Sequence, residues 1–300
     1  MLKVRFNVMS VIARAIEPSN ASEGSDSRRP TFVIRPRRGW AALHLGELWA
    51  YRDLLLILAE RDVKLRYKQT ALGVIWVVLQ PLVAALIFAA IFGACAKLPS
   101  DGNPYLLFVF CGMLPWNLFS GALQRAGNSL VGNANLISKV YFPRVIIPLA
   151  SVLSVLVDFA VSFVVMILFM LCYRVAPTWH LLALPFFLLL TFIAAVGISL
   201  WLTGLNVYYR DFMYALPFVI QVWLYASPVT YATSLIPEAW RMWYSLNPAA
   251  GFIEGFRWSL LGDGALTPEM IISSTVSSIV LLVSGIAVFR RIERGFADVL

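Results

Sequence analysis

The sequence predicts an all-α integral membrane protein with six transmembrane helices, an N-terminal interfacial amphipathic helix, and two short re-entrant helices between spans five and six. Of its 300 residues, 60% are hydrophobic and 13% are charged, whereas a typical soluble domain is about 45–50% apolar and about 25% charged. The apolar residues also form long runs without charges. Crossing a bilayer takes roughly 20 apolar residues of helix, and these runs are that long.

Three parts follow one another along the chain. Residues 1–42 are rich in Ser, Pro and Arg, which predicts a flexible basic cytoplasmic tail. In residues 43–70, apolar side chains recur at helical spacing and charged side chains crowd the segment from Glu60 to Lys68. That pattern indicates an amphipathic helix lying in the membrane interface. Residues 71–300 form the six-span transmembrane domain.

The six spans are the apolar runs of that domain. Their expected ranges are 72–96, 105–124, 145–173, 181–209, 212–237 and 270–289. Asp158 is the single charge within them. Because a charge in the bilayer core is costly, such a residue is a candidate for function. It could serve an ion-coupled carrier, or it could be a carboxyl group that is hydrogen-bonded to Ser or Thr inside the bundle.

Residues 238–269 do not fit a seventh span. They are rich in Trp and Phe but contain Arg241, Glu254 and Arg257, and Asn247-Pro248 interrupts them. Two short helices that dip into the outer side of the membrane and return are therefore expected. Glu254 and Arg257 lie three residues apart and can pair on one helix face.

The distribution of basic residues predicts the orientation. Six spans place both termini on one side, and most of the 24 Lys and Arg residues fall on that side. The opposite side holds Lys97, Arg174, Arg241 and Arg257. Because Lys and Arg accumulate in cytoplasmic segments, both termini are expected in the cytoplasm. The same rule explains the net charge of +8 without nucleic acid as a partner.

The sequence offers little chemistry for catalysis. It contains no GxxxxGK[ST] phosphate loop, no HExxH and no GxSxG motif. Cys95, Cys111 and Cys172 form no CxxC pair, so we expect neither a metal site nor a disulfide framework. No catalytic residue and no bound cofactor are expected, and any energy for transport must come from a partner or an ion gradient.

Four segments resemble one family in the same order. Residues 60–81 (ERDVKLRYKQTALGVIWVVLQP), 135–148 (NLISKVYFPRVIIP), 206–212 (NVYYRDF) and 225–262 are similar to segments of polysaccharide-export ABC permeases. These permeases export O-antigen, capsule or teichoic acid chains. The resemblance runs from about residue 45 to the C-terminus and does not include residues 1–40.

The resemblance implies a transport function and its partners. It implies a homodimer in the bacterial inner membrane that works with two separate ABC ATPase subunits, which bind ATP and Mg, on a lipid-linked glycan. The expected ATPase-coupling residues are Asn135, Leu136, Ile137, Lys139, Tyr141, Phe142, Arg144, Arg210 and Asp211. In the first of these segments, Asn133, Asn135 and Ser138 are expected to cap a short helix that exposes Leu136, Ile137, Val140, Tyr141 and Phe142.

Two further sets of residues are expected along the path of the glycan. Sugar rings stack on aromatic side chains, which makes Trp76, Phe88, Trp116 and Trp223 the expected channel-lining residues. The expected outer gate consists of Trp243, Glu254 and Arg257.

Three alternatives remain open at this point. An ABC permease for drugs or lipids would share the six spans but lack the segment around Asn247 to Arg257. A membrane glycosyltransferase or acyltransferase would need acidic or His side chains gathered at one membrane face, and the sequence has no such group. An ion-coupled carrier has only Asp158 in its favour.

Overall fold

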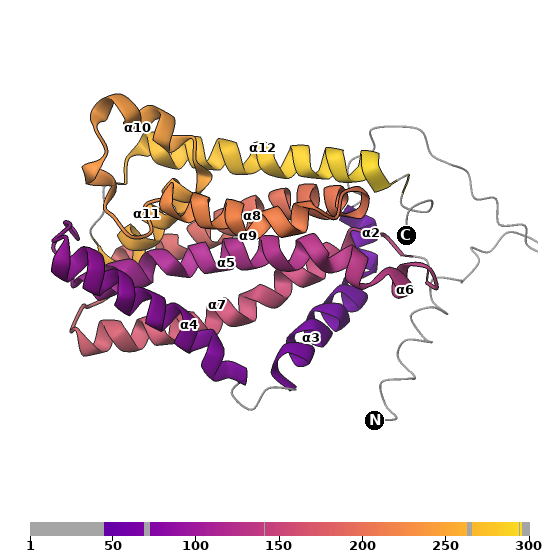
Figure 1. Cartoon of the computed structure of the whole chain (residues 1–300), viewed down its shortest axis with the longest axis horizontal. Helices are drawn as coiled ribbons and strands as arrows, with labels where there is room; N and C mark the ends of the chain where they lie inside the picture. The colour runs from indigo at the N-terminus through magenta and orange to yellow at the C-terminus, as the bar shows by residue number, and fades with distance from the viewer. Residues whose placement is uncertain (1–44, 69–72, 141, 263–265, 294, 296–300) are drawn as a thin grey trace, which may run out of the picture. The chain divides into compact units, whose positions relative to one another are not determined.

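The computed structural model describes residues 45–68, 73–140, 142–262, 266–293 and 295 (Figure 1). The predicted tail, residues 1–42, lies outside the described residues. The described part is helical and contains no strand, which confirms the predicted all-α class. Its α-helices are α2 Leu45–Ala50, α3 Arg52–Lys68, α4 Gly73–Phe88, α5 Tyr105–Gly132, α6 Ala134–Ile137, α7 Ile146–Cys172, α8 Leu184–Tyr208, α9 Phe212–Tyr225, α10 Glu238–Ser245, α11 Pro248–Leu261 and α12 Pro268–Glu293. Shorter elements are the π-helix η1 Ala89–Cys95 and the 3-10 helices η2 Trp179–Ala183 and η3 Thr233–Leu235.

Five helical segments of the described residues are long and apolar enough to cross a membrane. They are Ile75–Cys95, Tyr105–Gly132, Ile146–Cys172, Trp179–Tyr208 and Pro268–Glu293. All five coincide with predicted spans, which confirms that the chain has the character of a multi-pass membrane protein.

The predicted fifth span is shorter than expected. The run 212–237 is helical only over Phe212–Tyr225, 14 residues with Pro217 inside. At 1.5 Å per residue, α9 is about 21 Å long, less than the roughly 30 Å of bilayer hydrocarbon. Hydropathy alone could not show this break, because residues 226–236 are uncharged yet fold as turns and the short helix η3.

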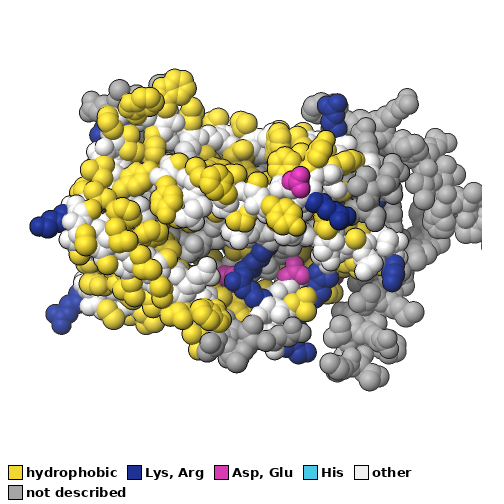
Figure 2. All heavy atoms as spheres, viewed as in Figure 1, with side chains coloured by type: hydrophobic (Ala, Val, Ile, Leu, Met, Phe, Trp, Pro, Cys, Tyr) yellow, Lys and Arg dark blue, Asp and Glu magenta, His cyan; other side chains and the backbone are white. Residues whose placement is uncertain are grey.

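Helix α5 forms the centre of the bundle. Most of its side chains are buried, whereas α4, α7 and α12 bury a much smaller share of theirs. The exposed side chains of these outer helices are largely apolar, and apolar side chains cover much of the surface in Figure 2. Such a surface fits lipid, in which apolar side chains need no partner.

The two glycines Gly197 and Gly285 permit the close approach of α8 and α12. A Cβ atom added at Gly285 would lie 2.1 Å from the backbone oxygen of Gly197, and one added at Gly197 would lie 2.5 Å from the backbone carbon of Leu281. Small residues at helix interfaces in membranes let backbones approach in this way. The α8–α12 contact therefore depends on the absence of side chains at both positions.

The two short helices predicted between residues 238 and 269 are present as α10 and α11. Asn247 caps α11 by accepting a hydrogen bond from the backbone N–H of Ala249 at 3.0 Å, and Pro248 follows as the first helical residue. Gly262 ends α11 with a φ of 81°, a conformation that favours glycine. Nearly all of α11 is buried, so this helix packs among α5, α8 and α12.

Candidate functional site

Asp158 on α7 is the centre of the first polar cluster. Its Oδ2 atom lies 2.8 Å from Nη1 of Arg66 on α3 and also pairs with Arg125 on α5. Its Oδ1 atom accepts a hydrogen bond from the hydroxyl group of Tyr67. We call Arg66, Tyr67, Arg125 and Asp158 the Asp158 cluster. It ties α3 to two helices of the bundle.

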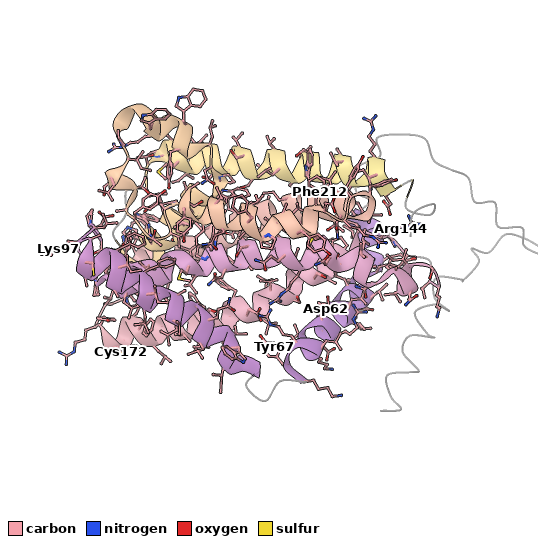
Figure 3. All side chains as sticks on the ribbon, in the orientation of Figure 1. Asp62, Tyr67, Lys97, Arg144, Cys172 and Phe212 are labelled. Atoms are coloured by element: carbon pink, nitrogen blue, oxygen red, sulfur yellow. The ribbon has the colours of Figure 1, made fainter. Side chains whose placement is uncertain are left out.

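A second set of polar contacts joins α3 to the bundle nearer the start of α7. The hydroxyl group of Ser151 donates to Oδ2 of Asp62 at 3.1 Å. Arg61 donates at 2.8 Å both to Asp62 and to Oδ1 of Asn133. Figure 3 shows Asp62 and Tyr67 along α3, where this helix approaches α7. The polar side of α3 thus packs on protein along α7, in addition to any contact with lipid.

These contacts correct three expectations from the sequence. Asp158 pairs with two arginines and a tyrosine instead of Ser or Thr. The predicted second span ended at residue 124, but α5 continues to Gly132, so Arg125 lies inside this helix. Asn133 does not cap α6, since its side chain bonds to Arg61 and to the backbone oxygen of Ser129.

The Asp158 cluster is a poor site for a proton carrier. Both oxygens of the Asp158 carboxyl group already have partners, because Oδ2 pairs with two guanidinium groups and Oδ1 accepts from Tyr67. Burial and the neighbouring Asp158 raise the pKa of the Tyr67 phenol, so this hydroxyl group stays protonated and donates. The geometry favours a structural tie between helices over the ion-coupled alternative.

Arg257 on α11 is the centre of the second polar cluster. Its Nη1 atom lies 3.0 Å from Oε1 of Glu254, and its Nη2 atom donates to the backbone oxygen of Val229 at 2.8 Å. Its guanidinium carbon lies 3.6 Å from the ring centroid of Phe108 on α5. Thr233 donates to Oε1 of Glu254 at 2.5 Å. We call Phe108, Thr233, Glu254 and Arg257 the Arg257 cluster.

The pairing of Glu254 with Arg257 confirms the prediction from their spacing. Their side chains are 0% and 1% exposed, so the pair lies in the protein interior. Trp243, the third residue of the predicted outer gate, is 68% exposed and does not join this pair. Oε2 of Glu254 and Nε of Arg257 have no hydrogen-bond partner within the described part of the chain.

The Arg257 cluster holds the connection between α9 and α10 against the bundle. Arg257 binds the backbone at Val229, and the hydroxyl group of Tyr105 donates to the backbone oxygen of Thr230. Asn247 adds a contact at 3.0 Å with the hydroxyl group of Ser227. Backbone groups outside helices need such partners when they are buried, and these side chains provide them.

The predicted coupling residues occupy three places. Asn135, Leu136 and Ile137 belong to α6, and Lys139 follows in an exposed turn. Arg144 precedes α7 and donates to the backbone oxygen of Glu293 at 3.0 Å. Arg210 and Asp211 are exposed between α8 and α9.

The structure corrects the exposed apolar face expected for this segment. Phe142 is 6% exposed and belongs to the hydrophobic core. Leu136 and Ile137 are half-buried against the same core, whereas Val140 is exposed. Tyr141 lies outside the described residues. Most of the predicted face therefore packs within the chain, and the exposed residues of the segment are mainly polar.

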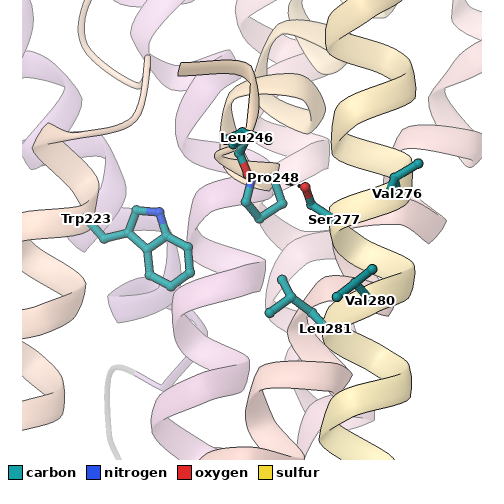
Figure 4. A pocket seen from close by; sticks show the side chains of 7 residues that line it. All are labelled: Trp223, Leu246, Pro248, Val276, Ser277, Val280 and Leu281. Atoms are coloured by element: carbon teal, nitrogen blue, oxygen red, sulfur yellow. Dashed lines mark hydrogen bonds between the residues drawn. The ribbon is translucent and has the colours of Figure 1, made fainter. Parts of the chain in front are cut away.

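The four predicted channel-lining aromatics do not share one surface. Trp116 is 4% exposed and packs against Phe119 in the core, so it cannot line an open path in this structure. Trp76 is exposed on α4, and Phe88 packs near Phe92 of η1. Trp223 lines a recess of about 340 Å³ between α9 and α12 (Figure 4).

Sequence reasoning missed the partners that complete both clusters. For Arg125 a signal was present, because Leu123, Ala126 and Leu130 continue the helical spacing beyond the predicted end of the span. For Arg66 and Thr233, the sequence contains no pattern that indicates their partners. Their contacts join positions that are 92 and 21 residues away along the chain.

Known proteins resemble the chain over most of its length. The model of the ABC-2 type transporter family matches residues 53–261. An O-antigen export system permease protein RfbA of Klebsiella pneumoniae is 31% identical over 258 residues, which cover 86% of this chain and 97% of that protein. RfbA of Myxococcus xanthus is 27% identical over 254 residues, which cover 84% and 97%. The polysialic acid transport protein KpsM of Escherichia coli is 21% identical over 234 residues, which cover 78% and 91%. The chain therefore belongs to the ABC-2 type transporter family of membrane proteins, as the resemblance in its sequence predicted.

Proposed function

We propose that this chain is the transmembrane subunit of an ABC exporter that moves a lipid-linked polysaccharide across the bacterial inner membrane. ATP, with Mg, is hydrolysed by a separate subunit, because the chain contains no phosphate loop. The observation that carries the proposal is the likeness to O-antigen permeases, which extends over 97% of the Klebsiella pneumoniae relative.

Two copies of the chain, with two ABC ATPase subunits on the cytoplasmic side, form the proposed transporter. The ATPase acts on the side that holds α2, α6 and the connection at Arg210 and Asp211. The Asp158 cluster and the contacts of Asp62 and Arg61 tie α3 to α5 and α7. A displacement of α3 is thereby passed to the spanning helices through ion pairs.

Deleting the gene in its host tests this function. We expect the polysaccharide to disappear from the cell surface, and its lipid-linked form to accumulate in the inner membrane, because synthesis continues without export. Surface labelling and extraction of lipid-linked glycan measure the two pools. Plasmid-borne wild-type protein should restore the surface glycan only with an ATPase that hydrolyses ATP. An unchanged surface glycan in the deletion strain would contradict the proposal.

The proposed topology has six crossings and both termini in the cytoplasm. The short helix α9 and the following residues 226–237 together make the fifth crossing, and α10 and α11 lie at the outer side. The folded connection at Val229 to Thr233 supports this arrangement, because its backbone is satisfied by buried side chains of α5 and α11.

Thiol labelling of intact cells separates six crossings from five. After replacement of Cys95, Cys111 and Cys172, single cysteines at the exposed positions Ala176 and Ser234 are expected to react with a membrane-impermeant reagent. Cysteines at Ser138 and Arg210, which are exposed at the other end of the bundle, should react only after the membrane is permeabilised. Protection of position 234 in intact cells would contradict the fifth crossing.

A further inference from the structure

The connection between α5 and α7 is attached at both of its ends to other helices by arginine side chains. At its start, Nη2 of Arg61 on α3 donates to Oδ1 of Asn133 at 2.8 Å. At its end, Nη1 of Arg144 donates to the backbone oxygen of Glu293, the last residue of α12, at 3.0 Å. These two contacts bridge 72 and 149 residues of the sequence. Figure 3 shows Arg144 at the end of the bundle that holds α6.

The chain between these two contacts is regular and packed. We call its described residues, 133–140 and 142–145, the α6 segment. Backbone hydrogen bonds continue through its helical turns as far as Val140, whose N–H group donates to the backbone oxygen of Leu136 at 3.1 Å. Phe142 and Val145 are buried in the hydrophobic core. Because close-packed side chains transmit strain, a push on this segment displaces it as a unit.

Arg144 binds α12 at the end where a helix best accepts a cation. The last four carbonyl groups of a helix have no partner within the helix, and the helix dipole places partial negative charge there. The guanidinium group of Arg144 meets one of these carbonyl groups, at Glu293. Arg144 is half-buried, so water competes less for this hydrogen bond than at an exposed position. The α6 segment is thereby attached to the last spanning helix.

Arg61 attaches the same segment to a different side of the bundle. Helix α3 packs on α7, whereas α12 packs on α8, and Figure 1 shows α3 and α12 on opposite sides of the spanning helices. The guanidinium group of Arg61 is also held by Asp62, which accepts from Ser151 on α7. Asn133 donates in turn to the backbone oxygen of Ser129 on α5. A displacement of the α6 segment therefore reaches α3 and α12 together.

We infer that Arg61 and Arg144 are positioning residues that make the α6 segment one rigid body with α3 and α12. A push on its exposed side chains, Asn135, Ser138 and Lys139, then moves two outer helices instead of bending a connection. The sequence placed Arg144 at the ATPase contact, and the structure directs its Nη1 atom to α12. The inference rests on the proposed function in one respect, because the separate ATPase subunit delivers the push.

The mobility of a spin label on the α6 segment tests the attachment. The label is placed on a single cysteine at the exposed position Ser138 of the full-length protein in nanodiscs, after replacement of the three native cysteines. Loss of a hydrogen bond from a charged donor is expected to raise the detached population of the segment about tenfold. Arg61→Gln and Arg144→Gln should therefore each increase the mobile fraction of the spectrum. Arg144→Lys should restore the wild-type spectrum, because one ammonium group can donate to one carbonyl oxygen.

The ratio of ATP hydrolysed to glycan exported tests the positioning role. It is measured in proteoliposomes that contain the complex of this chain with its ATPase subunit. We expect Arg61→Gln combined with Arg144→Gln to raise the ratio about fivefold or more, because the detached segment bends without moving α3 and α12. A mere loss of folded protein would lower hydrolysis and export in proportion and would leave the ratio unchanged.

A matched control uses an arginine of the same helix α3. Arg52 pairs with Asp53 and lies over the ring of Trp49, both close to it in the sequence, so Arg52→Gln should change neither the spectrum nor the ratio. Unchanged spectra in both glutamine variants would overturn the attachment. A mobile label with an unchanged ratio would overturn the positioning role. A wild-type complex that hydrolyses ATP but exports no glycan would contradict the proposed function instead, and the spin-label result would stand apart from it.

Discussion

Replacing Gly285 with alanine is expected to destabilise the transporter subunit by about 3 kcal/mol, an effect at the upper end of overpacked substitutions. A Cβ atom at this position meets the backbone oxygen of Gly197 at 2.1 Å. A side chain could rotate away, but a backbone oxygen within a helix cannot move without separating α8 from α12. The loss of stability is measured as a lower unfolding temperature, with thermal unfolding of the purified protein in detergent monitored by size-exclusion chromatography.

Two further substitutions make this expectation specific. Gly197→Ala should have a similar effect, because its Cβ atom would lie 2.5 Å from the backbone of Leu281. Gly204→Ala lies on the same helix α8, but its nearest neighbour is Cδ1 of Ile292 at 3.4 Å, so we expect little loss or a small gain in helix stability. Equal unfolding temperatures for the alanine variants of Gly285 and Gly204 would show that the two helices separate without cost.

Replacing Arg257 with methionine is expected to cost about 3–5 kcal/mol, because it leaves a buried carboxylate without its cation. Glu254 is 0% exposed and has only Thr233 as its other hydrogen-bond partner within the described residues. The same substitution removes the hydrogen bond to the backbone oxygen of Val229. We therefore expect a lower unfolding temperature and faster proteolysis of the connection between α9 and α10.

A double-mutant cycle separates the ion pair from general packing. Glu254→Gln combined with Arg257→Met removes both charges, and the double variant should be more stable than Arg257→Met alone. Arg241→Met serves as the control, because Arg241 is exposed and donates to the backbone oxygen of Ile236 at 3.2 Å. Its loss should change stability by less than about 1 kcal/mol. Strict additivity of the Glu254 and Arg257 substitutions would contradict a coupled pair.

The two polar clusters explain how a largely apolar chain holds α3 and the connection between α9 and α10 in place. The Asp158 cluster attaches α3 to α5 and α7. The Arg257 cluster attaches the connection between α9 and α10 to α5 and α11. Polar contacts between distant segments need matching partners, so each cluster specifies one arrangement of its helices where apolar packing alone would permit several.

The sequence by itself determined the properties that depend on local composition. Long uncharged runs predicted the five spanning helices, because the cost of charge in lipid acts residue by residue. Asn247-Pro248 predicted the break at which α11 begins, since caps act on adjacent backbone groups. The spacing of Glu254 and Arg257 predicted their ion pair, because residues three apart meet on one helix face.

Only the tertiary structure decided which distant residues meet. Asp158 pairs with Arg66 and Arg125. Phe142 and Trp116 pack into the core, and α9 ends at Tyr225. An apolar or aromatic side chain has the same hydropathy whether it faces lipid, a channel or another helix. The sequence therefore cannot show which of these the side chain contacts. A charge near the end of an apolar run is likewise compatible with a loop or with a paired position inside a helix. The packing of α3, α5 and α7 selects the second, because it brings the opposite charges within hydrogen-bonding distance.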